Sequence, residues 1–190
     1  MNRREAISSV ALLLGGSIVG GQAFILTGCS SSIKDVEDLF STESILLMDE
    51  IAETIIPKTN TPGAKDAKTG EFMAIMIKDC YTPEDQKIFL EGLQKIEDLS
   101  KKEYSGTFIE CTLEEKKKLL ESLDKEQKEY QHTRKEGAPQ HFFRMIKELV
   151  IFGYFTSEQG GSQNLTYVEV PGRFDGCIPY KKGDPVYLNP

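Results

Sequence analysis

The sequence contains no tryptophan, only two histidines, and four cysteines among 190 residues. The cysteines lie far apart and form no Cys-x-x-Cys pair, which argues against zinc, iron–sulfur and covalently attached haem sites. Neither His132 nor His141 lies in a motif that positions a nucleophile, so both are expected to be structural. No Gly-x-Gly-x-x-Gly motif and no phosphate-binding loop occurs. The sequence therefore predicts no catalytic, metal or cofactor site in this chain.

Positive charge is scarce relative to negative charge. The net charge is −7, and removal of residues 1–28 would take away two arginines and one glutamate, which leaves −8. A chain this acidic lacks the basic surface that binding to nucleic acid requires. The short basic run at residues 116–118 lies among glutamates and is interpreted as a solvated helix face. Nucleic acid is therefore not an expected partner.

The N-terminus has the three-part layout of an export signal. Arg3 and Arg4 form a twin arginine, residues 10–26 are apolar and uncharged, and Leu-Thr-Gly-Cys closes the segment at Cys29. This order is typical of a secretory signal, and the twin arginine indicates the route that carries folded proteins. The closing residues resemble the bacterial lipobox, in which the cysteine is lipidated and becomes the new N-terminus. We expect a lipid-anchored protein of the cell envelope that faces the periplasm.

The alternative for this segment is a plain transmembrane anchor, because the apolar stretch is close to spanning length. Several glycines dilute it, which favours the cleaved signal. Whether the anchored protein resides in the inner or the outer membrane stays open at this point.

Apolar residues of the mature chain recur at helical spacing and predict an all-α fold, a small helical bundle with a long irregular Gly/Pro-rich C-terminal coil. The predicted organisation is a signal peptide over 1–28, a tether over 29–41 and a helical domain over 42–190, with the coil from about residue 157. Thr82 before Pro83, and Thr112 with Glu115, are expected to cap two of the helices. The helix over 140–155 is the most apolar and is predicted to form the core of the bundle.

Aromatic side chains in the C-terminal coil suggest that it packs against another surface. Short extended pieces such as 166–170 are expected within it. The candidate side chains for contact with a partner are Tyr154, Glu158, Tyr167, Phe174 and Tyr180.

The cysteines of the mature domain allow a disulfide if the protein is exported. Pairing of Cys80 with Cys177 would tie the helix over 71–80 to the C-terminal coil and leave Cys111 free. Unpaired buried thiols are the alternative.

The loop Ile-Pro-Lys-Thr-Asn-Thr-Pro-Gly-Ala at residues 56–64, followed by Phe72 and by Asp-Cys-Tyr at 79–81, resembles the gluconate 2-dehydrogenase subunit 3 family. The segments Gly-Tyr-Phe-Thr-Ser-Glu at 153–158 and Pro-Gly-Arg-Phe-Asp-Gly-Cys at 171–177 agree with it. The likeness covers about residues 42 to 180, although the central helices carry little of it.

This resemblance implies a small, non-catalytic subunit of a membrane-associated sugar or sugar-acid dehydrogenase. The large partner subunit would carry FAD and belong to the glucose-methanol-choline oxidoreductase class, and a cytochrome c subunit often completes the complex. The small subunit frequently bears the twin-arginine signal and is thought to escort its folded, flavin-loaded partner. The lipobox departs from many members and raises the possibility that this chain anchors the complex. A freestanding envelope lipoprotein that acts as a binding or scaffold module is the alternative, and an independent enzyme is the least favoured.

Overall fold

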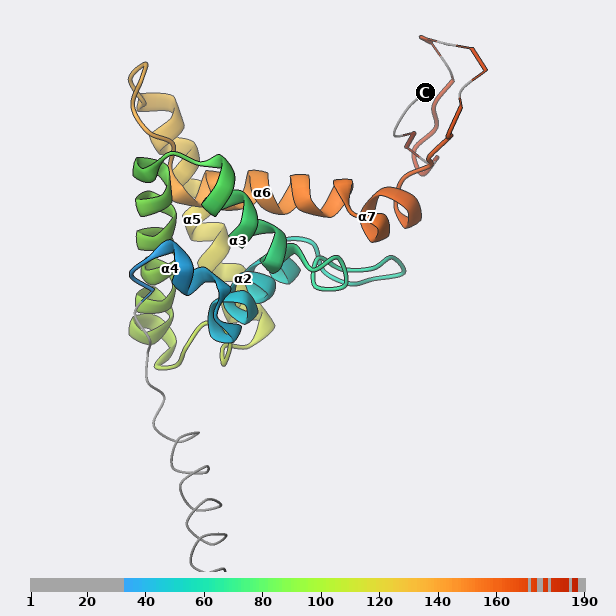
Figure 1. The fold of residues 1–190 in the computed structure, drawn as a ribbon. Coiled ribbons are helices and arrows are strands. Elements are labelled where there is room, and N and C mark those ends of the chain that lie inside the picture. Colours follow the sequence, from blue (N-terminus) through green and yellow to red (C-terminus); the bar gives the residue numbers. More distant parts are fainter. Residues whose placement is uncertain (1–32, 171, 174–175, 178, 185, 188–190) are drawn as a thin grey trace, which may run out of the picture. The chain divides into compact units, whose positions relative to one another are not determined.

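The computed structural model describes residues 33–170, 172–173, 176–177, 179–184 and 186–187. Its elements are η1 (Val36–Phe40), α2 (Thr42–Ile55), α3 (Thr69–Cys80), α4 (Pro83–Tyr104), α5 (Leu113–Thr133), α6 (Phe142–Thr156) and α7 (Glu158–Gln163) (Figure 1). The described residues form no strand, so the predicted all-α fold is confirmed. Within that part of the chain, no helix combines the length and apolar character needed to cross a bilayer. The predicted export residues Arg3, Arg4 and Cys29 lie outside the described residues.

Helix α6 occupies the centre of the bundle. It contacts α2, α3, α4 and α5, and Figure 1 shows it running across the long helices α4 and α5. Most of its length is apolar on the buried side, which confirms the core role predicted for residues 140–155. Its buried side chains are Phe142, Phe143, Met145, Ile146, Leu149, Val150 and Tyr154.

The helices begin where local chemistry satisfies their free backbone N–H groups. The hydroxyl of Thr82 accepts a hydrogen bond from the backbone N–H of Asp85, and Thr112 forms the predicted capping box with Glu115. His141 caps α6, since its Nδ1 accepts from the backbone N–H of Phe143 at 3.2 Å. The structure therefore contains the predicted caps, and His141 has a structural role as the cap of α6.

The folded domain begins earlier than the sequence predicts. Residues 33–40, which lie within the predicted tether, contain η1, and Asp35 with Asp38 forms a capping box at its start. Leu39 is fully buried, while Ile33 and Val36 pack against the core. A single helical turn is too short for periodicity to reveal it, because only three apolar residues mark the buried side.

A second difference lies at the start of the predicted C-terminal coil. Ser157 ends α6 and caps α7, since its hydroxyl accepts from the backbone N–H of Gly160 at 3.0 Å. Beyond α7, the described residues carry one isolated bridge between Thr166 and Tyr187. The coil therefore starts about six residues later than the sequence suggests.

The predicted disulfide between Cys80 and Cys177 is not formed. Both are free and exposed, and Cys111 is free and buried between the helices. Cys80 is the last residue of α3, where its side chain faces solvent rather than the domain interior.

Candidate functional site

Two segments far apart in sequence meet beside the bundle: the loop over residues 57–68, between α2 and α3, and the C-terminal end of α6. The phenol of Tyr154 is fully buried, and its hydroxyl donates a hydrogen bond to the carbonyl oxygen of Pro62 at 2.6 Å. Phe155 packs edge-on against Tyr154, with ring centroids 5.1 Å apart. Two of the family-like stretches, 56–64 and 153–158, fall largely within these segments. The fold brings the segments into one unit that we call the loop platform, residues 57–68 and 153–161.

Acidic side chains of α2 also hold the loop in place. Glu53 accepts hydrogen bonds from the backbone N–H of Lys58 at 2.8 Å and of Lys65 at 2.9 Å. An added Cβ on Gly63 would lie 2.4 Å from the same carboxylate, so a larger residue there would displace the Glu53 carboxylate from its present position. One carboxylate thus fixes both arms of the loop.

Further along α2, Asp49 and Glu50 extend the same acidic face. Asp49 accepts from the backbone N–H of Gly70 at 2.8 Å and holds the start of α3. Burial raises the pKa of Asp49, and the hydrogen bond from Gly70 opposes that rise only in part. Asp49 and Glu53 thus satisfy backbone donors at both ends of the loop, which otherwise has no regular structure.

Glu50 links the loop to α5. Its carboxylate forms ion pairs with Lys65 and with Lys116, the latter at 2.9 Å. Burial pushes the pKa of Glu50 upward, but the hydrogen bonds from Lys65 and Lys116 outweigh it and leave the pKa below its usual range. Lys116 is itself only 8 % exposed and lies over the ring of Phe108, so it is not part of a solvated face as the sequence suggested.

Glycines allow the end of α6 and α7 to pack closely. An added Cβ on Gly153 would lie 2.5 Å from the ring of Phe72, and one on Gly160 would lie 2.0 Å from the carbonyl oxygen of Tyr154. The ring of Phe72 also meets Phe152, with centroids 5.7 Å apart. The platform is therefore a packed structure rather than an open loop.

The tip of the loop is exposed, whereas its base is fixed. Residues 57–60 are all exposed, and Lys58 pairs with Asp66 at 2.9 Å. The hydrogen bond between the two raises the pKa of Lys58 and lowers that of Asp66. No histidine or cysteine belongs to this surface, and the described residues contain no cluster of three or more metal-ligating side chains. An exposed loop tip on a fixed base suits recognition of another protein surface.

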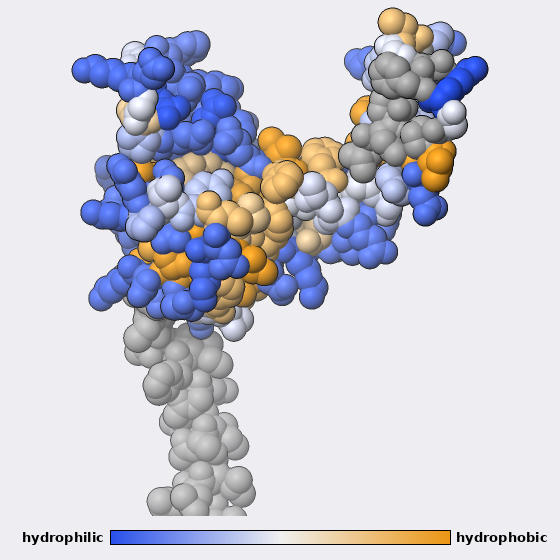
Figure 2. Space-filling view, turned by 45° about the horizontal axis from the view of Figure 1, so that its top comes forward, coloured by the Kyte–Doolittle hydropathy of each residue, from blue (hydrophilic) through white to orange (hydrophobic). Residues whose placement is uncertain are grey.

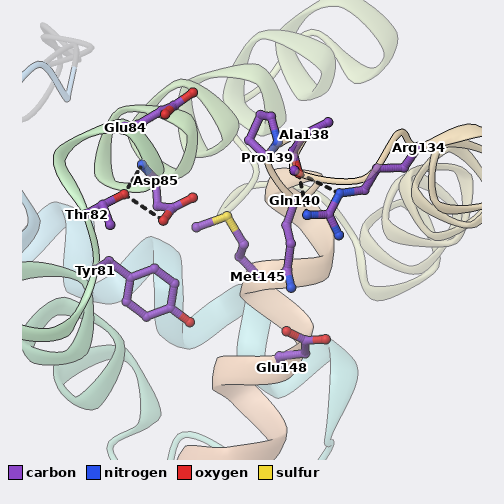
Figure 3. A pocket seen from close by; sticks show the side chains of 11 residues that line it. Tyr81, Thr82, Glu84, Asp85, Arg134, Ala138, Pro139, Gln140, Met145 and Glu148 are labelled. Atoms are coloured by element: carbon purple, nitrogen blue, oxygen red, sulfur yellow. Dashed lines mark hydrogen bonds between the residues drawn. The ribbon is translucent and has the colours of Figure 1, made fainter.

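A polar cleft of about 410 Å³ lies elsewhere, between the start of α4, α6 and the loop that joins α5 to α6. Figure 3 shows Tyr81, Gln140 and Glu148 among the side chains that line it. Burial raises the pKa of Tyr81, and the carboxylates of Glu148 and Asp85 add to this effect. The Nε of Arg134 is bound to the carbonyl oxygen of Ala138 at 2.7 Å.

Two further carboxylates of this cleft are also used by the fold. Asp85 accepts from the hydroxyl of Thr82 at 2.7 Å, and Glu148 accepts from Arg144 at 2.8 Å. The lining contains no cysteine, serine or histidine.

The predicted docking side chains divide into different environments. Tyr154 is buried within this chain, so its ring cannot contact a partner, which corrects the prediction. Glu158 is exposed in the first turn of α7, and Tyr167 and Tyr180 are 57 % and 66 % exposed. Phe174 lies outside the described residues.

Large apolar side chains are also exposed on the helical domain. Ile75 of α3 is 50 % exposed, and Ile151 and Phe152 of α6 are exposed to a similar degree. Figure 2 shows hydrophobic surface gathered over part of the domain, with hydrophilic residues around it. Contiguous apolar surface of this kind is typical of an interface.

Sequence reasoning missed the acidic side chains that hold the loop. Asp49, Glu50 and Glu53 lie at spacings of one and three residues near the end of a helix, directly before a loop rich in free backbone N–H groups. That spacing places them on one side of α2 and was the available signal.

Comparison with protein families identifies the loop platform as part of a recurrent sequence pattern. The sequence profile described as gluconate 2-dehydrogenase subunit 3 matches residues 42–172, which include α2 to α7. Comparisons with curated proteins and with solved structures give no significant match. Because the match covers most of the chain, including both segments of the loop platform, this protein belongs to the gluconate 2-dehydrogenase subunit 3 family.

Proposed function

We propose that this protein is the non-catalytic small subunit of a flavin-dependent sugar or sugar-acid dehydrogenase, and that it aids export, stability and membrane anchoring of the FAD-carrying subunit. Its family places it in a dehydrogenase complex with other subunits. The FAD subunit would be of the glucose-methanol-choline type, and a cytochrome c subunit is a further proposed partner. The substrate would be selected by the large subunit.

The observation that carries the proposal is the exposure of the C-terminal tail, residues 164–187 as far as they are described. Its large apolar side chains are largely accessible, and five of them exceed 40 % exposure. A segment that leaves this much apolar surface in water gains little stability by itself, because burial of apolar area is the main driving force. Tyrosines with a wet hydroxyl and an apolar ring are also frequent in protein interfaces. These side chains are Tyr167, Val170, Tyr180, Val186 and Tyr187.

The loop platform supplies a rigid neighbour for that tail. The residues directly before the tail, in α7, pack on Tyr154, which is hydrogen-bonded to Pro62. Because the platform is already ordered, a partner that binds it loses less conformational entropy than one that binds a flexible loop. The exposed loop tip at residues 57–60 and the tail are the surfaces we assign to the dehydrogenase subunit.

The N-terminal sequence supports the export and anchoring parts of the proposal. A twin arginine at Arg3 and Arg4 suits the transport of a partner that must be folded before it can retain flavin. Lipidation at Cys29 would then hold the assembled complex on the envelope membrane, facing the periplasm.

The test is capture of the tagged full chain from the solubilised membranes of its native cells, followed by identification of flavoproteins that are captured with it. We expect a flavin-containing complex, and we expect Tyr167→Ser/Tyr180→Ser/Tyr187→Ser to reduce capture at least tenfold without a change in thermal stability. The matched control is Leu46→Ser/Ile109→Ser/Leu113→Ser, which removes three exposed apolar side chains from the helical domain.

The export role has a separate readout. Substitution of both Arg3 and Arg4 by lysine is expected to leave the flavoprotein in the cytoplasm. Export that continues normally would contradict the escort role and leave the docking role standing. A chain that is always recovered alone from membranes would contradict the whole proposal and favour a freestanding lipoprotein.

A further inference from the structure

The first folded element, η1, is fixed firmly to the helical domain. Its Leu39 is fully buried, and Glu37 forms an ion pair of 2.8 Å with Lys78 at the end of α3. Asp38 accepts hydrogen bonds from the backbone N–H groups of Lys34 and Asp35 at 2.8 and 3.0 Å. The chain is therefore part of the rigid domain from Ile33 onward.

The lipobox cysteine lies a short distance before this point in the sequence. Only Ser30, Ser31 and Ser32 separate Cys29 from Ile33. The four steps from Cys29 to Ile33 reach at most roughly 13–14 Å in an extended chain. A lipid on Cys29 would consequently hold η1 within about that distance of the membrane surface, and the domain could not turn its opposite side toward the bilayer.

The side chains at this edge suit a lipid headgroup region. Phe40 is 40 % exposed, and the ammonium group of Lys78 lies 5.2 Å from its ring centroid. Lys34 is exposed beside the same element. An aromatic ring beside a lysine can enter the boundary between headgroups and acyl chains while the ammonium group stays in water. The domain as a whole is acidic, so its orientation would come from the tether and this ring rather than from net charge.

We propose that the η1 edge, defined by Lys34, Phe40 and Lys78, rests on the bilayer surface and is held there by the short tether. This inference depends on the lipid anchor of the proposed function. Figure 1 shows η1, in blue, on the opposite side of the helical domain from α7. The end of α6 and α7 then projects away from the membrane, where a large periplasmic partner has space.

The absence of tryptophan gives a direct test, because Phe40→Trp creates the single tryptophan of the protein. The lipidated full chain is inserted into vesicles of phosphatidylethanolamine and phosphatidylglycerol that contain a phospholipid brominated on its acyl chains. We expect quenching of Phe40→Trp by the brominated lipid and several-fold protection from iodide in the water. Lys34→Trp is a second probe of the same edge, in case replacement of Phe40 disturbs folding.

The matched control is Phe152→Trp, which is similarly exposed but lies on α6. Its quenching by iodide is expected to be the same with and without vesicles. A long Gly/Ser insertion after Ser32 is expected to restore access of iodide to Phe40→Trp, because the domain can then leave the surface.

Several outcomes would overturn the proposal. The first is that iodide quenches both Phe40→Trp and Lys34→Trp equally well with and without vesicles. The second is that vesicles protect Phe152→Trp from iodide instead. The third is that the Gly/Ser insertion leaves the protection of Phe40→Trp unchanged. Protection of Phe40→Trp by the flavoprotein in the absence of vesicles would instead assign this edge to a protein interface. Flotation with the vesicles distinguishes failure of the lipid anchor from failure of the proposed orientation. A chain that does not float lacks the anchor. A chain that floats while its Phe40→Trp remains accessible to iodide has the anchor without this orientation.

Discussion

The hydroxyl of Tyr154 donates a hydrogen bond of 2.6 Å to the carbonyl oxygen of Pro62, across a sequence separation of 92 residues. The bond joins the core helix α6 to the loop between α2 and α3. Since the ring of Tyr154 is fully buried, the hydroxyl has no access to bulk water as an alternative partner. The position of the loop is thereby coupled to the position of the core helix.

Tyr154→Phe tests this coupling, because it removes the hydroxyl and keeps the ring. We expect a loss of about 1–2 kcal/mol in the free energy of unfolding, the usual cost of an unpaired acceptor and a missing hydrogen bond. Urea unfolding followed by circular dichroism measures it. The exposed Tyr167→Phe is the control and should leave stability unchanged. An equal loss in both variants would show that the bond to Pro62 contributes nothing specific.

The close approach of α7 to the end of α6 depends on Gly160. An added Cβ would lie 2.0 Å from the backbone carbonyl oxygen of Tyr154, which cannot move without the helix. Gly160→Ala should therefore release α7, although alanine favours helix by about 0.5–1 kcal/mol where space is available. Faster hydrogen exchange at the amide of Gly161, which is bonded to the carbonyl of Ser157 at 2.8 Å, is the measurement.

Gly172→Ala is the control for that change, since nothing lies within 4 Å of a Cβ at this position. Unchanged exchange at Gly161 in Gly160→Ala would mean that α7 is not held by this contact. The tail, which we propose binds the dehydrogenase subunit, follows α7 directly, so the same variant should also weaken capture of that subunit.

Helices and their starts could be predicted from the sequence because they depend on local chemistry. The caps at Thr82 and Thr112 need only residues within one helical turn, and the apolar pattern over 140–155 identifies the core helix without its neighbours. The family-like segments could be identified for a different reason, since the resemblance lies in the residues themselves.

The features that were missed depend on contacts between distant residues. Lys116 looks solvated within its basic run, but Glu50 lies 66 residues earlier and withdraws it from water. In the sequence, Tyr154 appears available for contact with a partner, but in the structure its hydroxyl donates a hydrogen bond to the carbonyl oxygen of Pro62. Neither separation leaves a periodic signal, so only the folded chain reveals which polar groups are used internally.

Glu53 is predicted to control the order of the loop more than the stability of the domain. Glu53→Ala removes the acceptor for the amides of Lys58 and Lys65, at a cost of about 1–2 kcal/mol. We expect at least tenfold faster hydrogen exchange at both amides. Glu121→Ala, on an exposed position of α5, is the matched removal of a carboxylate and should leave that exchange unchanged. Slow exchange that persists in Glu53→Ala would mean that other contacts order the loop.

Asp124 is predicted to set part of the acid stability. Burial acts to raise its pKa, but hydrogen bonds from Lys128, Lys147 and Gln127 outweigh it and lower the pKa from 3.8 to about 2. The ion pairs measure 2.7 Å to Lys128 and 2.5 Å to Lys147. The second pair joins α5 to α6, so the charge on Asp124 supports the packing of the core helix.

The sign of the pH effect follows from the lowered pKa. The folded state favours the ionised carboxylate, so its stabilisation is complete above about pH 4 and is lost as the pH falls through about 2. We expect about 1–2 kcal/mol from this group, after allowance for its partial contact with solvent. Asp124→Asn should lower the unfolding free energy at neutral pH by that amount and flatten its dependence on pH between 5 and 2, compared with Asp79→Asn at the exposed end of α3. A variant as stable as wild type at neutral pH, with an unaltered acid transition, would place the pH dependence in other carboxylates.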